Sequence, residues 1–182
     1  LPIPDPEKVK SPEVTTSSPP VGSQVDIEYA AKLLLEAEGP VIVADRAARS
    51  NAGVKALVEL AELLNCPVIS LEGRMNFPTR HYLHHSANRG KLLREADVIL
   101  ALELTSLWSV AYYIPDNAHR EPTLRTVRED VKIIDISAVH SFSKSNHMET
   151  SRHVSTEITI PADAEATIPH VIDAIKKSNA VQ

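Results

Sequence analysis

The sequence is short of the residues that several kinds of functional site require. It contains only five glycines and one cysteine, Cys66. A single cysteine cannot form an internal disulfide and leaves no cysteine pair to bind a metal. The glycines form no G-x-G-x-x-G or G-x-x-x-x-G-K-[ST] phosphate loop and no G-x-S-x-G nucleophile turn. The sequence therefore carries none of the common signatures of nucleotide binding or of a serine nucleophile.

Long apolar runs and basic blocks are also missing. The apolar runs are far shorter than the roughly 20 residues that a membrane helix needs, so we expect no membrane partner. The net charge is −5, from 19 Lys and Arg against 24 Asp and Glu, so nucleic acid is not an expected partner either. The first residues have neither the charged nor the apolar region of a signal peptide. Together with the single cysteine, this predicts a cytoplasmic protein.

Proline is concentrated at the beginning of the chain. Residues 1–24 hold six of the thirteen prolines, and the first residue is Leu1 rather than methionine. Repeated proline removes backbone donors and favours extended chain. We therefore expect residues 1–25 to be an interdomain linker and residues 26–182 to be one domain. This beginning also indicates a fragment of a longer protein.

Short apolar runs alternate with helical patterns along the rest of the chain. Runs rich in β-branched residues predict strands, and apolar spacing of i, i+3, i+4 and i+7 predicts helices. Asp26 is the expected N-cap of the first helix. Pro169 belongs either to the first turn of the last helix or inside a longer helix that begins near Asp163. The strands are predicted at 41–44, 67–71, 96–102, 131–136 and 156–160, with a sixth possible between 73 and 90, and the helices near 27–34, 54–64, 88–95 and 168–175.

This alternation predicts an α/β fold, a doubly wound, Rossmann-like parallel sheet of five or six strands. Ligands of such sheets bind beyond the carboxyl ends of the strands. Asp45, Arg46 and Ser50 follow the first predicted strand, and Asp135 and Ser137 end the fourth. These five residues are the candidate nucleotide-binding crevice. The alternatives are a surface loop for the first three and a turn or helix cap for Asp135.

Two further segments carry residues of the kinds found in functional sites. His81, His84 and His85 lie close together, but the metal motifs with this spacing need a supporting acid, so we predict a polar loop or a subunit contact and no metal site. The segment 104–114 holds the only tryptophan, Trp108, and also Tyr112. It is either a short helix packed on its own core or an exposed aromatic patch at an interface or ligand wall.

Several segments, in their order and spacing, resemble the central domain of thiamine-diphosphate-dependent enzymes of the acetolactate synthase and 2-oxo acid decarboxylase type. The resemblance covers about residues 26–180 and is carried by residues 30–44, 57–68, 73–81, 93–102 and 160–163.

The resemblance implies that the domain lies between two catalytic domains that bind thiamine diphosphate and magnesium. Some members of the family bind FAD or ADP in the central domain, whereas in others it serves packing. Flavin-binding members commonly have glycine where this chain has Asp45-Arg46 and Glu103, and the extra side chains speak against FAD or ADP here.

We therefore expect no catalytic residue and no cofactor in this chain itself. The parent is expected to be a lyase or carboligase that acts on a 2-oxo acid or a related acyl donor. The domain would bridge the other domains of the parent and support a homo-oligomer, with His84, Trp108 and Tyr112 at an interface or cleft wall. The alternative is a free-standing module that binds FAD, ADP or NAD.

Overall fold

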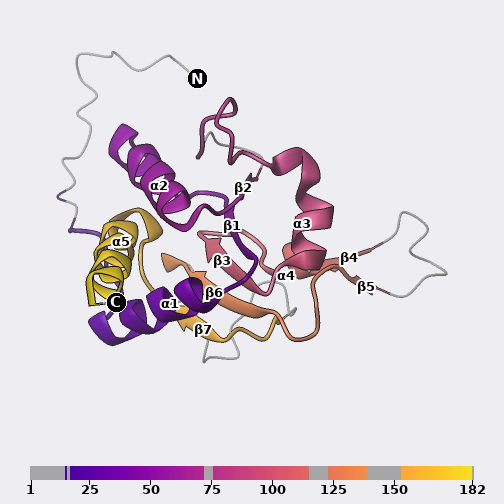
Figure 1. Cartoon of the computed structure of the whole chain (residues 1–182). Helices are drawn as coiled ribbons and strands as arrows, with labels where there is room; N and C mark the ends of the chain where they lie inside the picture. The colour runs from indigo at the N-terminus through magenta and orange to yellow at the C-terminus, as the bar shows by residue number, and fades with distance from the viewer. Residues whose placement is uncertain (1–14, 16, 72–75, 115–122, 139–152, 182) are drawn as a thin grey trace, which may run out of the picture.

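The computed structural model describes residues 15, 17–71, 76–114, 123–138 and 153–181 (Figure 1). Most of the expected linker therefore lies outside the described residues. The helices are α1 (Gln24–Glu36), α2 (Asn51–Leu64), η1 (Ser86–Asn88, a 3-10 helix), α3 (Arg89–Glu95), α4 (Trp108–Ala111) and α5 (Ala164–Val181). The strands are β1 (Pro40–Ala44), β2 (Val68–Ser70), β3 (Val98–Leu102), β4 (Tyr112–Tyr113), β5 (Leu124–Arg125), β6 (Lys132–Ile136) and β7 (Ile158–Ile160).

Five strands form one sheet in the order β2-β1-β3-β6-β7, and every neighbouring pair is parallel. All five were predicted from the apolar runs. The segment 73–90 adds no sixth strand within its described part, residues 76–90, where only a single bridge joins His84 to Val68. The strand order reverses between β1 and β3, so the crevice at the carboxyl ends of these two strands is the place where this topology holds ligands.

Helices cover both faces of the sheet, as Figure 1 shows. Helices α1, α2 and α5 pack on the face that carries Ile42, Leu100 and Ile134. Helices α3 and α4 pack on the opposite face, which carries Val43 and Ile99. The doubly wound fold is therefore confirmed. None of the helices in the described residues has the length and hydrophobicity needed to cross a lipid bilayer.

The first helix begins earlier than the sequence predicted. Ser23, not Asp26, is the N-cap of α1, and its hydroxyl oxygen accepts a hydrogen bond from the Asp26 N–H at 3.3 Å. The Ser23 hydroxyl also donates to the Asp26 carboxylate at 2.6 Å. The Ser23 hydroxyl thereby satisfies one of the free N–H groups at the helix start. The prediction of Asp26 as the cap was wrong because Asp26 acts from inside the first turn.

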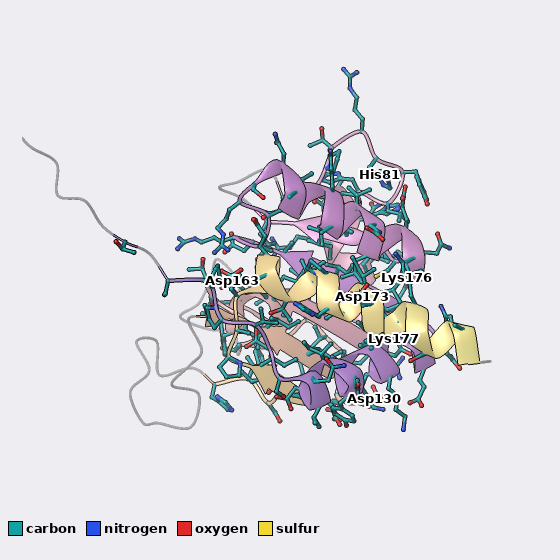
Figure 2. All side chains as sticks on the ribbon, turned by 90° about the vertical axis from the view of Figure 1, so that its left-hand side faces the viewer. His81, Asp130, Asp163, Asp173, Lys176 and Lys177 are labelled. Atoms are coloured by element: carbon teal, nitrogen blue, oxygen red, sulfur yellow. The ribbon has the colours of Figure 1, made fainter. Side chains whose placement is uncertain are left out.

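The last helix follows the longer of the two predicted alternatives. Helix α5 begins at Ala164 and contains Pro169. Asp163 precedes the helix, and its carboxylate accepts the Ala166 N–H at 2.9 Å, so it acts as the cap. Figure 2 shows Asp163 at the opposite end of α5 from Lys176. The charged side chain of Asp163 thus lies at the end of α5 where the helix dipole favours a negative group.

Strand β2 is an outer strand of the sheet, and a loop segment covers its free side. The Val68 N–H donates to the Leu83 carbonyl at 2.8 Å, and the His85 N–H donates to the Val68 carbonyl at 2.9 Å. The Ser86 hydroxyl continues this pairing, because it accepts the Ser70 N–H at 2.9 Å and donates to the Ser70 carbonyl at 3.2 Å. A side chain here substitutes for the backbone of a neighbouring strand.

A small antiparallel hairpin, β4 with β5, was not predicted. Tyr112 pairs with Arg125, and Tyr113 pairs with Leu124. Figure 1 shows this hairpin at the side of the molecule opposite α1 and α5. Its second strand, β5, lies in the described part of the polar stretch 115–130.

Candidate functional site

Asp45 lies at the switch point of the sheet, directly after β1. Its N–H donates to the Leu102 carbonyl at 3.1 Å. Its carboxylate accepts the N–H and the hydroxyl of Thr105 at 3.1 and 2.6 Å. Only 7% of Asp45 is exposed, so it does not belong to a surface loop. Asp45 instead joins the end of β1 to the loop that follows β3.

The N-terminus of α2 is satisfied by two acceptors from the protein itself. Ser50 is the N-cap of α2, and its hydroxyl oxygen accepts the Gly53 N–H at 3.0 Å. The Glu165 carboxylate, from the first turn of α5, accepts the Arg49 N–H, the Ser50 N–H at 3.1 Å and the Ser50 hydroxyl at 2.8 Å. The helix start that could bind an external anion therefore already holds a carboxylate.

The charges around α2 and α5 stabilise this arrangement. Burial raises the pKa of the Glu165 carboxyl, but hydrogen bonds from Arg49 and Ser50 and the charge of Arg49 outweigh burial and hold this pKa below its ordinary value. The Arg49 guanidinium pairs with Asp163 at 2.5 Å. Arg46, by contrast, has an exposed side chain. Of the two arginines in the loop, Arg49 is thus bound to a carboxylate of the chain.

Glu103, which was not among the predicted site residues, links three elements at the carboxyl edge. Its carboxylate accepts the Ser137 hydroxyl at 3.2 Å, the Ala138 N–H at 3.3 Å and the Ala164 N–H at 3.0 Å. Glu103 is 7% exposed, and its φ is 49°, in the left-handed region that favours glycine. The sequence signal was the absence of glycine after β3, but it did not reveal what the carboxylate binds.

The two candidates on β6 lie in different surroundings. Ser137 is fully buried and donates to Glu103, so it belongs to the carboxyl edge. Asp135 is 2% exposed and lies within the strand, paired in register with Ala101 and Thr159. Since side chains alternate along a strand and Ile133 packs in the core beneath α3 and α4, Asp135 faces away from α2 and α5. The structure therefore does not bring Asp135 together with Ser50.

The aromatic candidates form a cluster beside the hairpin. The Trp108 and Tyr112 rings stack with centroids 5.3 Å apart, and the Arg125 guanidinium lies 5.9 Å from the Tyr112 ring centroid. Both rings are half-buried and pack against the core beneath α3 and α4, whereas Tyr113 is 53% exposed. The segment 104–114 therefore contains both a short helix that packs on the core of the domain and an exposed part of the hairpin.

His84 occupies a separate place, beside the free side of β2. Its Nε2 lies 3.1 Å from the Ser86 hydroxyl, which is itself bound to Ser70.

The described residues contain no group of three or more His, Cys, Asp or Glu side chains that could hold a metal ion. Cys66 is fully buried, and burial raises the pKa of its thiol to about 12, which disfavours the reactive thiolate.

The residues at the switch point do not fit a nucleotide diphosphate. Asp45 and Glu103 lie at the strand ends, where dinucleotide folds place glycine and a close backbone approach. Glu165 takes the anion position at α2. The crevice therefore offers carboxylates where a flavin or an adenine nucleotide presents negatively charged phosphates.

The family follows from a match to residues 27–171, which fit the sequence model described as "Thiamine pyrophosphate enzyme, central domain". The chain belongs to this family. The predicted resemblance is confirmed, and the parallel sheet with helices on both faces agrees with it. The stretch that matches begins near the start of α1 and ends within α5, so it includes all five strands of the main sheet.

Individual relatives agree with the family. A sulfoacetaldehyde acetyltransferase of Roseovarius nubinhibens is 33% identical over 102 residues, which are 52% of this chain and 17% of that protein. Benzoylformate decarboxylase of Polynucleobacter necessarius superposes with a TM-score of 0.63 at 19% identity, over 92% of this chain and 30% of that one. A thiamine diphosphate-dependent 4-hydroxybenzoylformate decarboxylase of Rhodococcus jostii RHA1 gives 0.62 at 20% identity, over 91% and 29%. The chain thus spans under a third of each of these proteins.

Proposed function

We propose that this chain is the non-catalytic central domain of a longer, cytoplasmic enzyme that depends on thiamine diphosphate and magnesium. The observation that carries the proposal is the carboxyl edge of the sheet in a chain of this family. There, Asp45, Glu103 and Glu165 are all hydrogen-bonded to the chain itself. An edge whose polar groups are satisfied in this way supports a role in holding domains together rather than in chemistry.

The parent enzyme is proposed to be a lyase or transferase that acts on a 2-oxo acid or a related acyl donor. The names of the relatives support this class, since they are an acetyltransferase and two decarboxylases. The residues that bind thiamine diphosphate and magnesium would lie in the other domains of the parent. The free-standing nucleotide-binding module is not favoured, because the family is that of thiamine pyrophosphate enzymes and the Rhodococcus relative is named as thiamine diphosphate-dependent.

We further propose that the hairpin side of the domain contacts the other domains of the parent enzyme within its homo-oligomer. Tyr113 and Leu124, which pair across the hairpin, are 53% and 48% exposed. Tyr112 belongs to the hairpin, and its ring stacks on the Trp108 ring of α4. An isolated two-stranded hairpin is only marginally stable in water. Apolar side chains on it would be stabilised by a covering domain.

The division of labour can be tested by calorimetry with thiamine diphosphate and magnesium. We expect the full-length parent to bind thiamine diphosphate and the 182-residue chain to show no binding under the same conditions. The physical reason is that the described residues provide neither a metal-ligand group nor free helix-terminal donors at α2. Tight, magnesium-dependent binding by the chain alone would show that the domain contributes the cofactor site, contrary to the proposal.

The contact surface can be tested in the full-length parent by replacing Tyr113 and Leu124 with serine. We expect the oligomer to dissociate at higher protein concentration than the wild type, because apolar burial contributes roughly 25 cal/mol per Å². Analytical ultracentrifugation measures this. The matched control is Tyr82→Ser, since Tyr82 is 65% exposed but lies in the loop beside β2. Unchanged dissociation in the double serine variant, or an equal change in the control, would contradict the assignment of this surface.

A further inference from the structure

In a doubly wound fold, a phosphate commonly binds at the N-terminus of the helix that corresponds to α2. In this chain, the Glu165 carboxylate occupies that position. Helix α2 has 14 residues and follows the strand at the switch point. The Glu165 carboxylate accepts hydrogen bonds from the N–H groups of Arg49 and Ser50 and from the Ser50 hydroxyl. A phosphate at a helix N-terminus is bound by the same kinds of donor. The carboxylate thus uses the donors that a phosphate would require.

Gly53 shows how closely the carboxylate approaches the helix. This buried glycine is the third residue of α2, and its N–H is bound by the Ser50 hydroxyl. A Cβ built on Gly53 would lie 2.4 Å from Oε2 of Glu165, which is too close for any real contact. Dinucleotide folds use glycine near this position so that a phosphate can approach the backbone. In this chain the missing side chain makes room for Glu165.

The surrounding charges disfavour an added anion. Asp45 and Glu103 are buried at the neighbouring strand ends, and Asp163 lies two residues before Glu165 in the chain. Arg49 is paired with Asp163 at 2.5 Å. A diphosphate placed here would have to displace the Glu165 carboxylate and would bring further negative charge to an edge of the sheet that already holds Asp45 and Glu103.

We propose that Glu165 acts as an internal substitute for a nucleotide phosphate and closes the crevice at the start of α2 to diphosphate ligands. The contact explains how a domain of this fold can keep the helix terminus satisfied without a bound nucleotide. It does not depend on the bridging function proposed above, because it concerns only groups within this chain.

The test is pyrophosphate binding to Glu165→Ala, measured by calorimetry on the 182-residue chain. Removal of the carboxylate frees the donors of Arg49 and Ser50 and removes one repelling charge. We expect Glu165→Ala to bind pyrophosphate at least about tenfold more tightly than the wild type. The added substitution Gly53→Ala should return the affinity to that of the wild type, because its methyl group fills the space that the carboxylate left.

Glu59→Ala is the matched control, since it removes the same charge from the exposed side of α2, where Glu59 pairs with Lys176 at 2.6 Å. It should bind pyrophosphate no better than the wild type. The circular dichroism melt of each variant reports folding, and Glu165→Ser replaces Glu165→Ala if the latter does not fold. The proposal is overturned if the wild type binds pyrophosphate or ADP as tightly as the variant. It is equally overturned if the folded variant gains no affinity, or if Gly53→Ala leaves the gained affinity intact. Thiamine diphosphate binding by the parent is a separate readout, so the two proposals can fail independently.

Discussion

Glu103→Ala is expected to lower the free energy of unfolding by about 4 kcal/mol. The substitution removes the acceptor of the Ser137 hydroxyl and of the Ala138 and Ala164 N–H groups. Each buried donor that is left without its charged acceptor lowers the free energy of unfolding by about 1 to 3 kcal/mol. Urea unfolding followed by circular dichroism measures the change. A loss under about 1 kcal/mol would show that water replaces the carboxylate without difficulty.

Glu103→Gly is the control that separates the carboxylate from the backbone. Glutamate and alanine both have a Cβ, which disfavours the left-handed conformation by about 1 to 2 kcal/mol, whereas glycine has none. Because φ of Glu103 is 49°, we expect the glycine variant to be about 1 kcal/mol more stable than the alanine variant. Equal stabilities of the two variants would contradict this account of the backbone at the end of β3.

Asp97→Ala is expected to cost about 1.5 kcal/mol at pH 7 and progressively less as the pH falls through the lowered pKa of Asp97. The Asp97 carboxylate accepts the N–H groups of Glu38 and Gly39 at 2.7 and 2.9 Å and so ties the turn before β1 to the start of β3. Burial raises the pKa of Asp97, but four backbone hydrogen bonds outweigh burial, and the net pKa lies below its ordinary value.

The direction of the pH effect follows from this lowered pKa. A carboxyl whose pKa is lower in the folded than in the unfolded state stabilises the fold above the unfolded pKa, near 4 for aspartate, and loses this contribution as the pH falls through the folded value. Urea titrations at a series of pH values test this. Asp130→Ala is the control, because Asp130 is exposed and pairs only with Arg128 among the described residues. It should change stability little. A pH-independent loss for Asp97→Ala would contradict the account.

The buried strands could be predicted from the sequence because both of their faces are covered. Every residue of β3 is buried, and so are four of the five in β6, of which only Asp135 is polar, so apolar side chains follow one another with little alternation. Such runs are continuous in the sequence and need no knowledge of distant contacts. The hairpin gave no comparable signal, since each of its strands has two residues and β5 is exposed.

The candidate site could be predicted only in part. The positions of Asp45, Ser50 and Ser137 at the carboxyl edge follow from the order of strands and helices. Their partners do not, because Glu165 meets Ser50 across 115 residues of sequence and Asp45 meets Thr105 across 60. A single sequence indicates which acids lie near a strand end or a helix start. It does not indicate which of them bind the protein itself.

The segment beside β2 determines how this protein can meet other chains. A bare outer strand presents unpaired backbone groups and is a template for aggregation. On β2 the groups of Val68 and Ser70 are already bound to Leu83, His85 and the Ser86 side chain. At the other end of the sheet, β7 offers only three residues. Local detachment of the loop that carries Ser86 would therefore leave the backbone groups of this outer strand unpaired without global unfolding of the domain.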